Sequence, residues 1–270
     1  MRQLKKVSYI ILLMATAITV DAQDTARMIK DFNKVMSFSI EPYIHYRSVT
    51  NIQVTPLLQP EDTMTLKGEF YKYKDNLYYG NAKEEMFMQD SFYIQVNHDR
   101  KTIWISKLNE AAKAKMNYMP LNDKQLQELF RKKFTISEQN LNDQVRQLNF
   151  ESKQYFDTVA LVVVNIGLQY SGKNFIPQLM EMNVRMKQPI TSDQIQELTS
   201  VEAKQAVEHA GAVNYFVHNQ KVSVLFEDID NTKEKALQMP SWKDRLVYNE
   251  QSREFAGKGS YSDYEITKTF

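Results

Sequence analysis

The chain has no cysteine and few of the residues that build compact catalytic or metal sites. It holds four histidines, seven glycines and seven prolines in 270 residues. Without cysteine there is no disulfide, no thiolate nucleophile and no thiolate metal ligand. Stability must therefore come from burial of apolar surface, which a chain of this length can supply.

Sequence motifs of common enzymes are also missing. There is no GxSxG elbow, no HExxH and no phosphate-binding loop. His98 and His218 lie in expected turns, and His45 and His209 have no second histidine at ligand spacing. The segment 257–260 contains two glycines but lacks the spacing that aims backbone N–H groups at a phosphate. The sequence therefore predicts no enzymatic activity, no metal site and no cofactor.

Charge of either sign is scarcely in excess. Thirty-four Lys and Arg residues balance 33 Asp and Glu residues, for a formal net charge of +1. Nucleic-acid-binding proteins carry a strong basic excess, so this balance argues against a nucleic-acid partner. It also gives no reason to expect a polybasic membrane patch.

The first 22 residues have the pattern of a cleavable signal peptide. Arg2, Lys5 and Lys6 form a positive segment, an apolar run follows over residues 7–20, and small or modest residues precede cleavage after Ala22. The alternative is a membrane anchor, which needs roughly 20 consecutive apolar residues. The apolar run is shorter than that and is interrupted by polar residues, so cleavage is favoured.

Export follows from the predicted signal peptide. Residues 23–270 would then form one β-rich domain in the bacterial periplasm, with secretion as the alternative location. Without the charges of residues 1–22 the net charge falls from +1 to about −1. No later segment is apolar enough to cross a bilayer as a helix.

Alternating apolar and polar residues predict most of this domain to be β-structure. The apolar sequence Val159–Val164 predicts a strand that is covered on both faces. In the segment 179–187 methionine and valine alternate with charged and amide residues, which predicts a half-buried strand. The other predicted strands and hairpins lie at 37–54, 64–73, 86–97, 93–108 and 215–226, the last with a turn around His218-Asn219-Gln220.

Helical spacing of apolar residues predicts a few helices beside these strands. The first, over residues 25–36, opens the domain. Two further stripes, at 126–134 and 137–148, predict helices that cross a sheet. The last predicted helix, over residues 191–210, begins with a capping box at Thr191 and Gln194 and ends before Gly211.

Methionine is unusually frequent on the predicted strands. Eleven of the 13 methionines lie after the signal peptide. An unbranched, polarizable methionine side chain fits variable apolar ligands, although methionine also fills irregular cores. The residues predicted to line an apolar ligand cavity are Met86, Met88, Phe92, Met180, Met182 and Met186.

Part of the chain resembles the periplasmic lipoprotein-carrier (LolA-like) superfamily. The resemblance rests on the opening helix, the strand with Gly68-Glu69-Phe70, the aromatic strand with Leu77-Tyr78-Tyr79 and the hairpin over 93–108. It implies an α+β fold in which a curved antiparallel sheet, an incomplete β-barrel, is covered by a few helices. In that family the concave apolar face takes up acyl chains. The aromatic strand here lacks the arginine, and the hairpin lacks the Asp-Gly turn, that such carriers show, so no residue of their release mechanism is carried over.

Two functions are therefore predicted. The first is a periplasmic protein that binds or carries an apolar ligand, a lipid or the acyl chain of a lipoprotein. The alternative is a non-enzymatic structural or interaction protein of the envelope, with an envelope protein as its partner. Its docking strand would be the aromatic C-terminus, with Tyr261, Tyr264, Ile266 and Phe270.

Overall fold

The computed structural model describes residues 25–57, 62–108, 124–156 and 161–270. The predicted signal peptide lies outside these residues. In the described part, 13 strands form one large sheet in the order β15-β6-β5-β4-β3-β2-β1-β12-β10-β9-β8-β7, with β11 paired to β12. All pairs are antiparallel except β15 with β6. The predicted antiparallel sheet with few helices is confirmed, and the sheet is not closed.

The strands of the large sheet become longest at its centre. Their bounds are β1 (Tyr43–Thr55), β2 (Thr63–Tyr73), β3 (Asn76–Asn81), β4 (Glu84–Gln89), β5 (Phe92–Asn97), β6 (Thr102–Lys107), β7 (Phe134–Asn140), β8 (Val145–Ser152), β9 (Val163–Ser171), β10 (Pro177–Ile190), β11 (Val207–Ala210), β12 (Val213–Asp230) and β15 (Glu265–Lys268). A separate hairpin joins β13 (Leu246–Asn249) to β14 (Glu254–Gly257).

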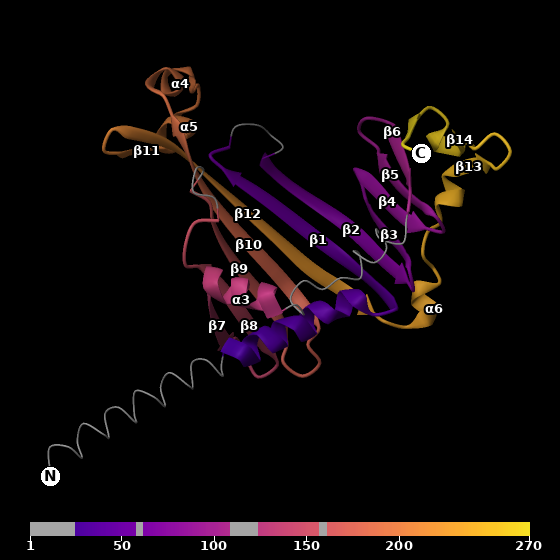
Figure 1. Ribbon diagram of the computed structural model, residues 1–270, viewed down its shortest axis with the longest axis horizontal. Helices are drawn as coiled ribbons and strands as arrows, with labels where there is room; N and C mark the ends of the chain where they lie inside the picture. The colour runs from indigo at the N-terminus through magenta and orange to yellow at the C-terminus, as the bar shows by residue number, and fades with distance from the viewer. Residues whose placement is uncertain (1–24, 58–61, 109–123, 157–160) are drawn as a thin grey trace, which may run out of the picture.

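The helices are few, and two of them lie across one face of the sheet (Figure 1). A helix over residues 25–36 crosses the sheet near one end of its central strands (Figure 1). The others are η1 (Ser37–Ile40), α3 (Lys124–Lys133), α4 (Ser192–Glu197), α5 (Val201–Gln205), α6 (Lys233–Ala236), η4 (Trp242–Asp244) and η5 (Gly259–Tyr261).

Two apolar cores cover opposite faces at the two sides of the sheet. The first, which we call the helix-side core, packs the helix over residues 25–36 on β7, β8 and β9 through Ile29, Val35, Phe150 and Leu168. The second, the C-terminal core, packs the segment after α6 on β2 to β6, and its members are Tyr71, Tyr78, Phe87, Phe92, Ile94, Val96, Ile103, Ile105, Trp242, Leu246 and Phe255. Because directly paired residues share a face, the strand registers place these cores on opposite sides.

Several predicted elements are confirmed. The helix over residues 25–36, the strand over residues 64–73 and the hairpin over residues 93–108 are present. The half-buried strand at 179–187 forms the middle of β10. The capping box at Thr191 and Gln194 is also present, and it starts α4.

Three predictions about secondary structure were wrong. The predicted helix at 137–148 is the β7–β8 hairpin, and Asn142 Oδ1 accepts hydrogen bonds from two backbone N–H groups in its turn. The predicted hairpin at 215–226 is part of the continuous strand β12, which pairs with both β1 and β10. The predicted helix at 191–210 is α4, α5 and β11, because Leu198 has an extended backbone.

Two other predicted strands differ in their bounds. The expected strand at 86–97 is two strands, β4 and β5, separated by a turn in which Asp90 has a φ of 57°. Of the expected strand at 159–164, residues 159 and 160 lie outside the described residues, and β9 begins at Val163.

Candidate ligand-binding face

Apolar residues form continuous rows across one face of the central strands, which we call the apolar face. Cross-strand partners lie side by side on one face of a sheet. One row consists of Met64 (β2), Ile52 (β1), Val222 (β12), Met182 (β10), Ile166 (β9), Phe150 (β8) and Ile136 (β7). The next row consists of Leu66, Thr50, Val224, Met180, Leu168 and Leu148. The pairing of these strands therefore places the apolar residues of separate segments side by side, on one continuous surface.

The opposite side of the same strands, which we call the polar face, carries hydrophilic residues. A row one position away along each strand consists of Thr63, Gln53, Lys221, Asn183, Asn165, Glu151 and Thr135. Lys221 forms an ion pair with Glu181 at 2.8 Å on this face. The sheet is therefore amphipathic across its centre, as expected for strands with one solvated side.

The apolar face changes from buried to half-buried along its rows. Phe150 is fully buried beneath the helix over residues 25–36. Met182, Val222 and Ile52, farther along the same row, are only half-buried. The central strands therefore present a partly accessible apolar surface beside a covered core.

An aromatic cluster borders this surface. Tyr46 of β1 stacks on Phe70 of β2, with ring centroids 4.8 Å apart, and meets the edge of Phe226 at 5.5 Å. Phe38 of η1 packs on both Tyr46 and Phe226. Burial raises the pKa of Tyr46 to about 12, so its phenol is neutral at physiological pH. The cluster forms one apolar end of the face.

Gly68 leaves room for the Tyr79 ring on the apolar face, beside this cluster. A Cβ atom at Gly68 would lie 2.9 Å from Tyr79 Cε2 and 3.2 Å from Ser48 Oγ. Asn81 Nδ2 donates a hydrogen bond to Tyr79 Oη at 3.0 Å. The glycine in the strand is therefore explained by a close approach of an aromatic ring.

Sequence reasoning missed a polar cluster on the opposite face, in which two buried residues contact a partly exposed glutamate. His45 Nε2 lies 2.8 Å from Glu69 Oε1, and Tyr71 Oη donates to the same oxygen at 2.9 Å. Burial alone would raise the pKa of Glu69, but the hydrogen bonds with His45 and Tyr71 outweigh it and lower that pKa. His45 is 3% exposed, and its Nδ1 has no hydrogen-bond partner among the described residues. Because the three residues come from two paired strands, sequence spacing gave no signal for their contact.

A second polar cluster, around the buried Glu85, holds the C-terminal segment on β4. Glu85 accepts hydrogen bonds from Arg245 Nε at 3.0 Å and from Tyr261 Oη at 2.7 Å. His98, which was predicted only to lie in a turn, is 3.4 Å from the same carboxylate. Burial, followed by the hydrogen bond to Glu85, raises the pKa of Tyr261 to about 12. The cluster connects β4, the β5–β6 turn and the C-terminal segment.

The predicted docking strand at the C-terminus is used within the chain. Residues Glu265–Lys268 form β15, which pairs with β6 at the edge of the sheet. Tyr261, Tyr264 and Ile266 pack against the C-terminal core, and the ring of Phe270 lies 5.9 Å from that of Phe92.

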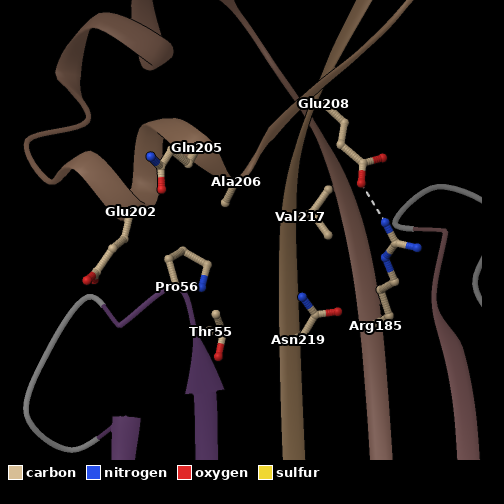
Figure 2. Close-up of a pocket in the computed structure, with 9 residues that line it drawn as sticks. All are labelled: Thr55, Pro56, Arg185, Glu202, Gln205, Ala206, Glu208, Val217 and Asn219. Atoms are coloured by element: carbon tan, nitrogen blue, oxygen red, sulfur yellow. Dashed lines mark hydrogen bonds and ion pairs between the residues drawn. The ribbon is translucent and has the colours of Figure 1, made fainter.

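A cavity of about 480 Å³ lies on the polar face, between the end of β1 and α5 (Figure 2). Two of its charged lining residues are paired with each other, since Glu208 accepts a hydrogen bond from Arg185 at 2.5 Å, and Glu208 also accepts one from Lys187 at 2.5 Å. The hydrogen bond from Lys187 is the main cause that lowers the pKa of Glu208. The polar side chains among its lining residues are all at least partly exposed. The cavity therefore offers no buried polar group that would select a ligand among its described lining residues. We place the candidate site on the apolar face.

Five of the six predicted lining residues lie on the apolar face, on two strands, β4 and β10, that are separated by β3, β2, β1 and β12. Met180, Met182 and Met186 lie on the apolar face of β10, and register places Met86 and Met88 of β4 on the same face. All five are half-buried. Phe92 is separate from them, because it lies on the other face, 8% exposed, within the C-terminal core. The sequence did not indicate Ile52, Met64 and Val222, which come from distant segments and join the same row.

The described residues contain neither a cluster of metal ligands nor a membrane-spanning helix. No group of three or more His, Cys, Asp or Glu residues there could hold a metal ion. No helix in the described ranges is both long and apolar enough to span a membrane.

Comparisons with known proteins find similarity in structure only. No family model matches the chain, and no curated protein matches it. A LolA superfamily protein from Nitrosomonas europaea is similar over 75% of this chain and 95% of its own, with 8% identity and a TM-score of 0.26. A DUF1329 family protein from Desulfovibrio piger is similar over 85% of this chain and 99% of its own, with 6% identity and a TM-score of 0.31. The LolA-like superfamily, to which the sequence shows a resemblance, is thus represented among the solved structures similar to this chain.

Proposed function

We propose that this chain is a non-enzymatic protein of the bacterial periplasm that binds or carries an apolar ligand, a lipid or a lipoprotein acyl chain. The bent, open sheet would act as an incomplete barrel, and its apolar face would receive the acyl chain. The signal peptide predicted over residues 1–22 would direct the protein there.

One observation carries this proposal: a row of half-buried apolar side chains crosses five central strands. The row runs from Met64 to Ile166 and is backed by polar residues on the other face. Four strand spacings of about 4.8 Å make it roughly 19 Å long, a length that suits an extended acyl chain. Each methylene that leaves water on this surface would contribute about 0.8 kcal/mol.

The side chains that we assign to the ligand are those of the apolar face. Met180, Met182 and Met186 supply flexible, polarizable contacts that accommodate chains of different shape. Met86 and Met88 extend the same face toward β4. Phe92 is omitted, because it lies in the C-terminal core.

Titration of the purified protein with a fluorescent fatty acid tests the proposal. We expect saturable uptake, a blue shift of the emission and displacement by unlabelled long-chain fatty acid. A folded protein that neither takes up the probe nor contains lipid would contradict the proposal and favour an envelope interaction protein, which crosslinking in whole cells would then address.

A further inference from the structure

Basic and aromatic side chains gather where α3 passes into β7 and where β8 ends. We call this group the basic-aromatic patch, and it consists of Arg131, Lys132, Lys133, Lys153, Tyr155 and Phe156. Backbone and side-chain contacts hold the two segments together. Lys153 N donates to Lys133 O at 2.8 Å, and Lys153 Nζ donates to Arg131 O at 3.0 Å. The amino group of Lys133 lies 5.3 Å from the centre of the Phe156 ring.

The patch is a local excess of positive charge on a nearly neutral chain. It contains four cations, whereas the whole protein has a net charge of +1. Glu128 and Glu151 are the acidic residues of α3 and of the end of β8. The overall charge balance gave no reason to expect such a patch, because a net charge does not show where the charges lie.

Exposed aromatic rings accompany these cations. Tyr155 is 44% exposed and Phe156 is 42% exposed. Arg131, Lys132 and Lys153 are exposed as well. Aromatic rings favour the level of lipid headgroups, and clustered Lys and Arg attract anionic headgroups. Exposed aromatic rings beside clustered cations are therefore typical of a surface that contacts anionic lipid headgroups.

The patch adjoins the apolar face. Phe134, which packs on Phe156 with ring centroids 5.2 Å apart, pairs with Ser152 at the end of β8. The Ser152 hydroxyl accepts a hydrogen bond from Val164 N at 2.9 Å, and Val164 pairs with Val184. Val184 is two residues from Met182 on the same face of β10. Phe134, Ser152, Val164 and Val184 thus form a row of neighbours on the apolar face that leads from the patch to the strand that carries Met182.

We propose that the basic-aromatic patch docks the protein on an anionic membrane surface, at the end of the sheet where an acyl chain enters or leaves the apolar face. The role in ligand entry rests on the proposed function, whereas docking itself can be measured separately. Each basic residue near such a surface contributes about fivefold to binding.

Cosedimentation with vesicles tests the docking. We expect the protein to bind vesicles that contain phosphatidylglycerol and to bind pure phosphatidylcholine vesicles at least tenfold more weakly. Binding should decline between about 0.1 M and about 1 M salt, as the Debye length falls from about 10 to about 3 Å.

Two double variants test whether vesicle binding depends on the patch itself or only on the total charge of the protein. Arg131→Glu with Lys132→Glu should weaken vesicle binding at least tenfold, and Tyr155→Ser should weaken it also at high salt. Lys173→Glu with Lys258→Glu makes the same change of charge at exposed sites elsewhere and should leave most of the binding. Circular dichroism would check that each variant is folded.

Fatty-acid uptake by the same variants distinguishes the two proposals. Loss of vesicle binding with uptake retained supports the docking patch. Equal vesicle binding by the patch variant and its control, or equal binding to both kinds of vesicle, would overturn it. Vesicle binding without any fatty-acid uptake would support the docking proposal and contradict the carrier function.

Discussion

Met182 and Asn183 are neighbours on β10 whose side chains leave the sheet on opposite faces. Met182 pairs with Val222 and Ile166, whereas Asn183 pairs with Lys221. One residue step therefore separates a partly accessible apolar row from a solvated polar row. These neighbours provide a matched pair of positions at which to test the ligand face.

Met182→Glu should weaken fatty-acid uptake at least tenfold, because a carboxylate on the apolar face must lose water when the ligand binds. Asn183→Glu adds the same charge to the polar face and should leave uptake unchanged. Fluorescent fatty-acid titration and circular dichroism of both variants check this. Equal uptake by the two variants would remove Met182 from the ligand site, and unfolding of the Met182 variant would make it an ordinary core residue.

Gly68→Ala should destabilise the protein by about 1–3 kcal/mol, since the new Cβ would collide with the Tyr79 ring. Gly167→Ala is the control, because its nearest neighbours to a Cβ lie at 3.7 Å, an ordinary contact distance. Urea unfolding would measure both changes. A Gly68 variant as stable as the Gly167 variant would mean that Tyr79 does not lie against β2.

Glu85→Gln should lower the free energy of unfolding by about 2 kcal/mol or more, because Arg245 would lose its carboxylate partner. Limited proteolysis should then cleave the C-terminal segment sooner than in the unaltered protein. Glu254→Gln removes an exposed carboxylate that pairs with Lys268 and should cost less than about 1 kcal/mol. Similar losses in both variants would contradict the holding role of Glu85.

Alkaline pH should destabilise the fold through its buried tyrosines. Burial raises the pKa values of Tyr46 and Tyr78 from 10.0 to about 12, so the folded state favours the neutral phenols. Their stabilising contribution is complete below pH 10 and is lost as the pH rises through 12. Urea midpoints measured across this range should fall. A flat profile would show that these phenols ionise equally well in the folded and unfolded chain.

Strands with one buried and one solvated face were predictable, because their alternation is visible in the sequence. Met180, Met182 and Met186 were assigned to one face of a strand on this basis, and β10 confirms that assignment. The β7–β8 hairpin was missed because Leu141, Val145 and Leu148 happen to have helical spacing. In the structure, turn hydrogen bonds at Asn142 reverse the chain between two strands.

The composition of the ligand face could not be predicted, because it depends on which strands are neighbours. Ile52 and Val222 are far apart in sequence and meet only through the β1–β12 pairing. Phe92 was grouped with Met86 and Met88 because the alternation was read as one strand. The turn at Asp90 begins a new strand, and its register places Phe92 on the opposite face.

Native mass spectrometry of the protein purified from the envelope fraction, followed by organic extraction and lipid analysis, tests the carrier proposal most directly. The proposal predicts a stoichiometric lipid or lipopeptide adduct that diminishes in Met182→Glu and persists in Asn183→Glu. A folded protein with a clean ligand-free mass, and no adduct after incubation with long-chain fatty acid, would contradict it.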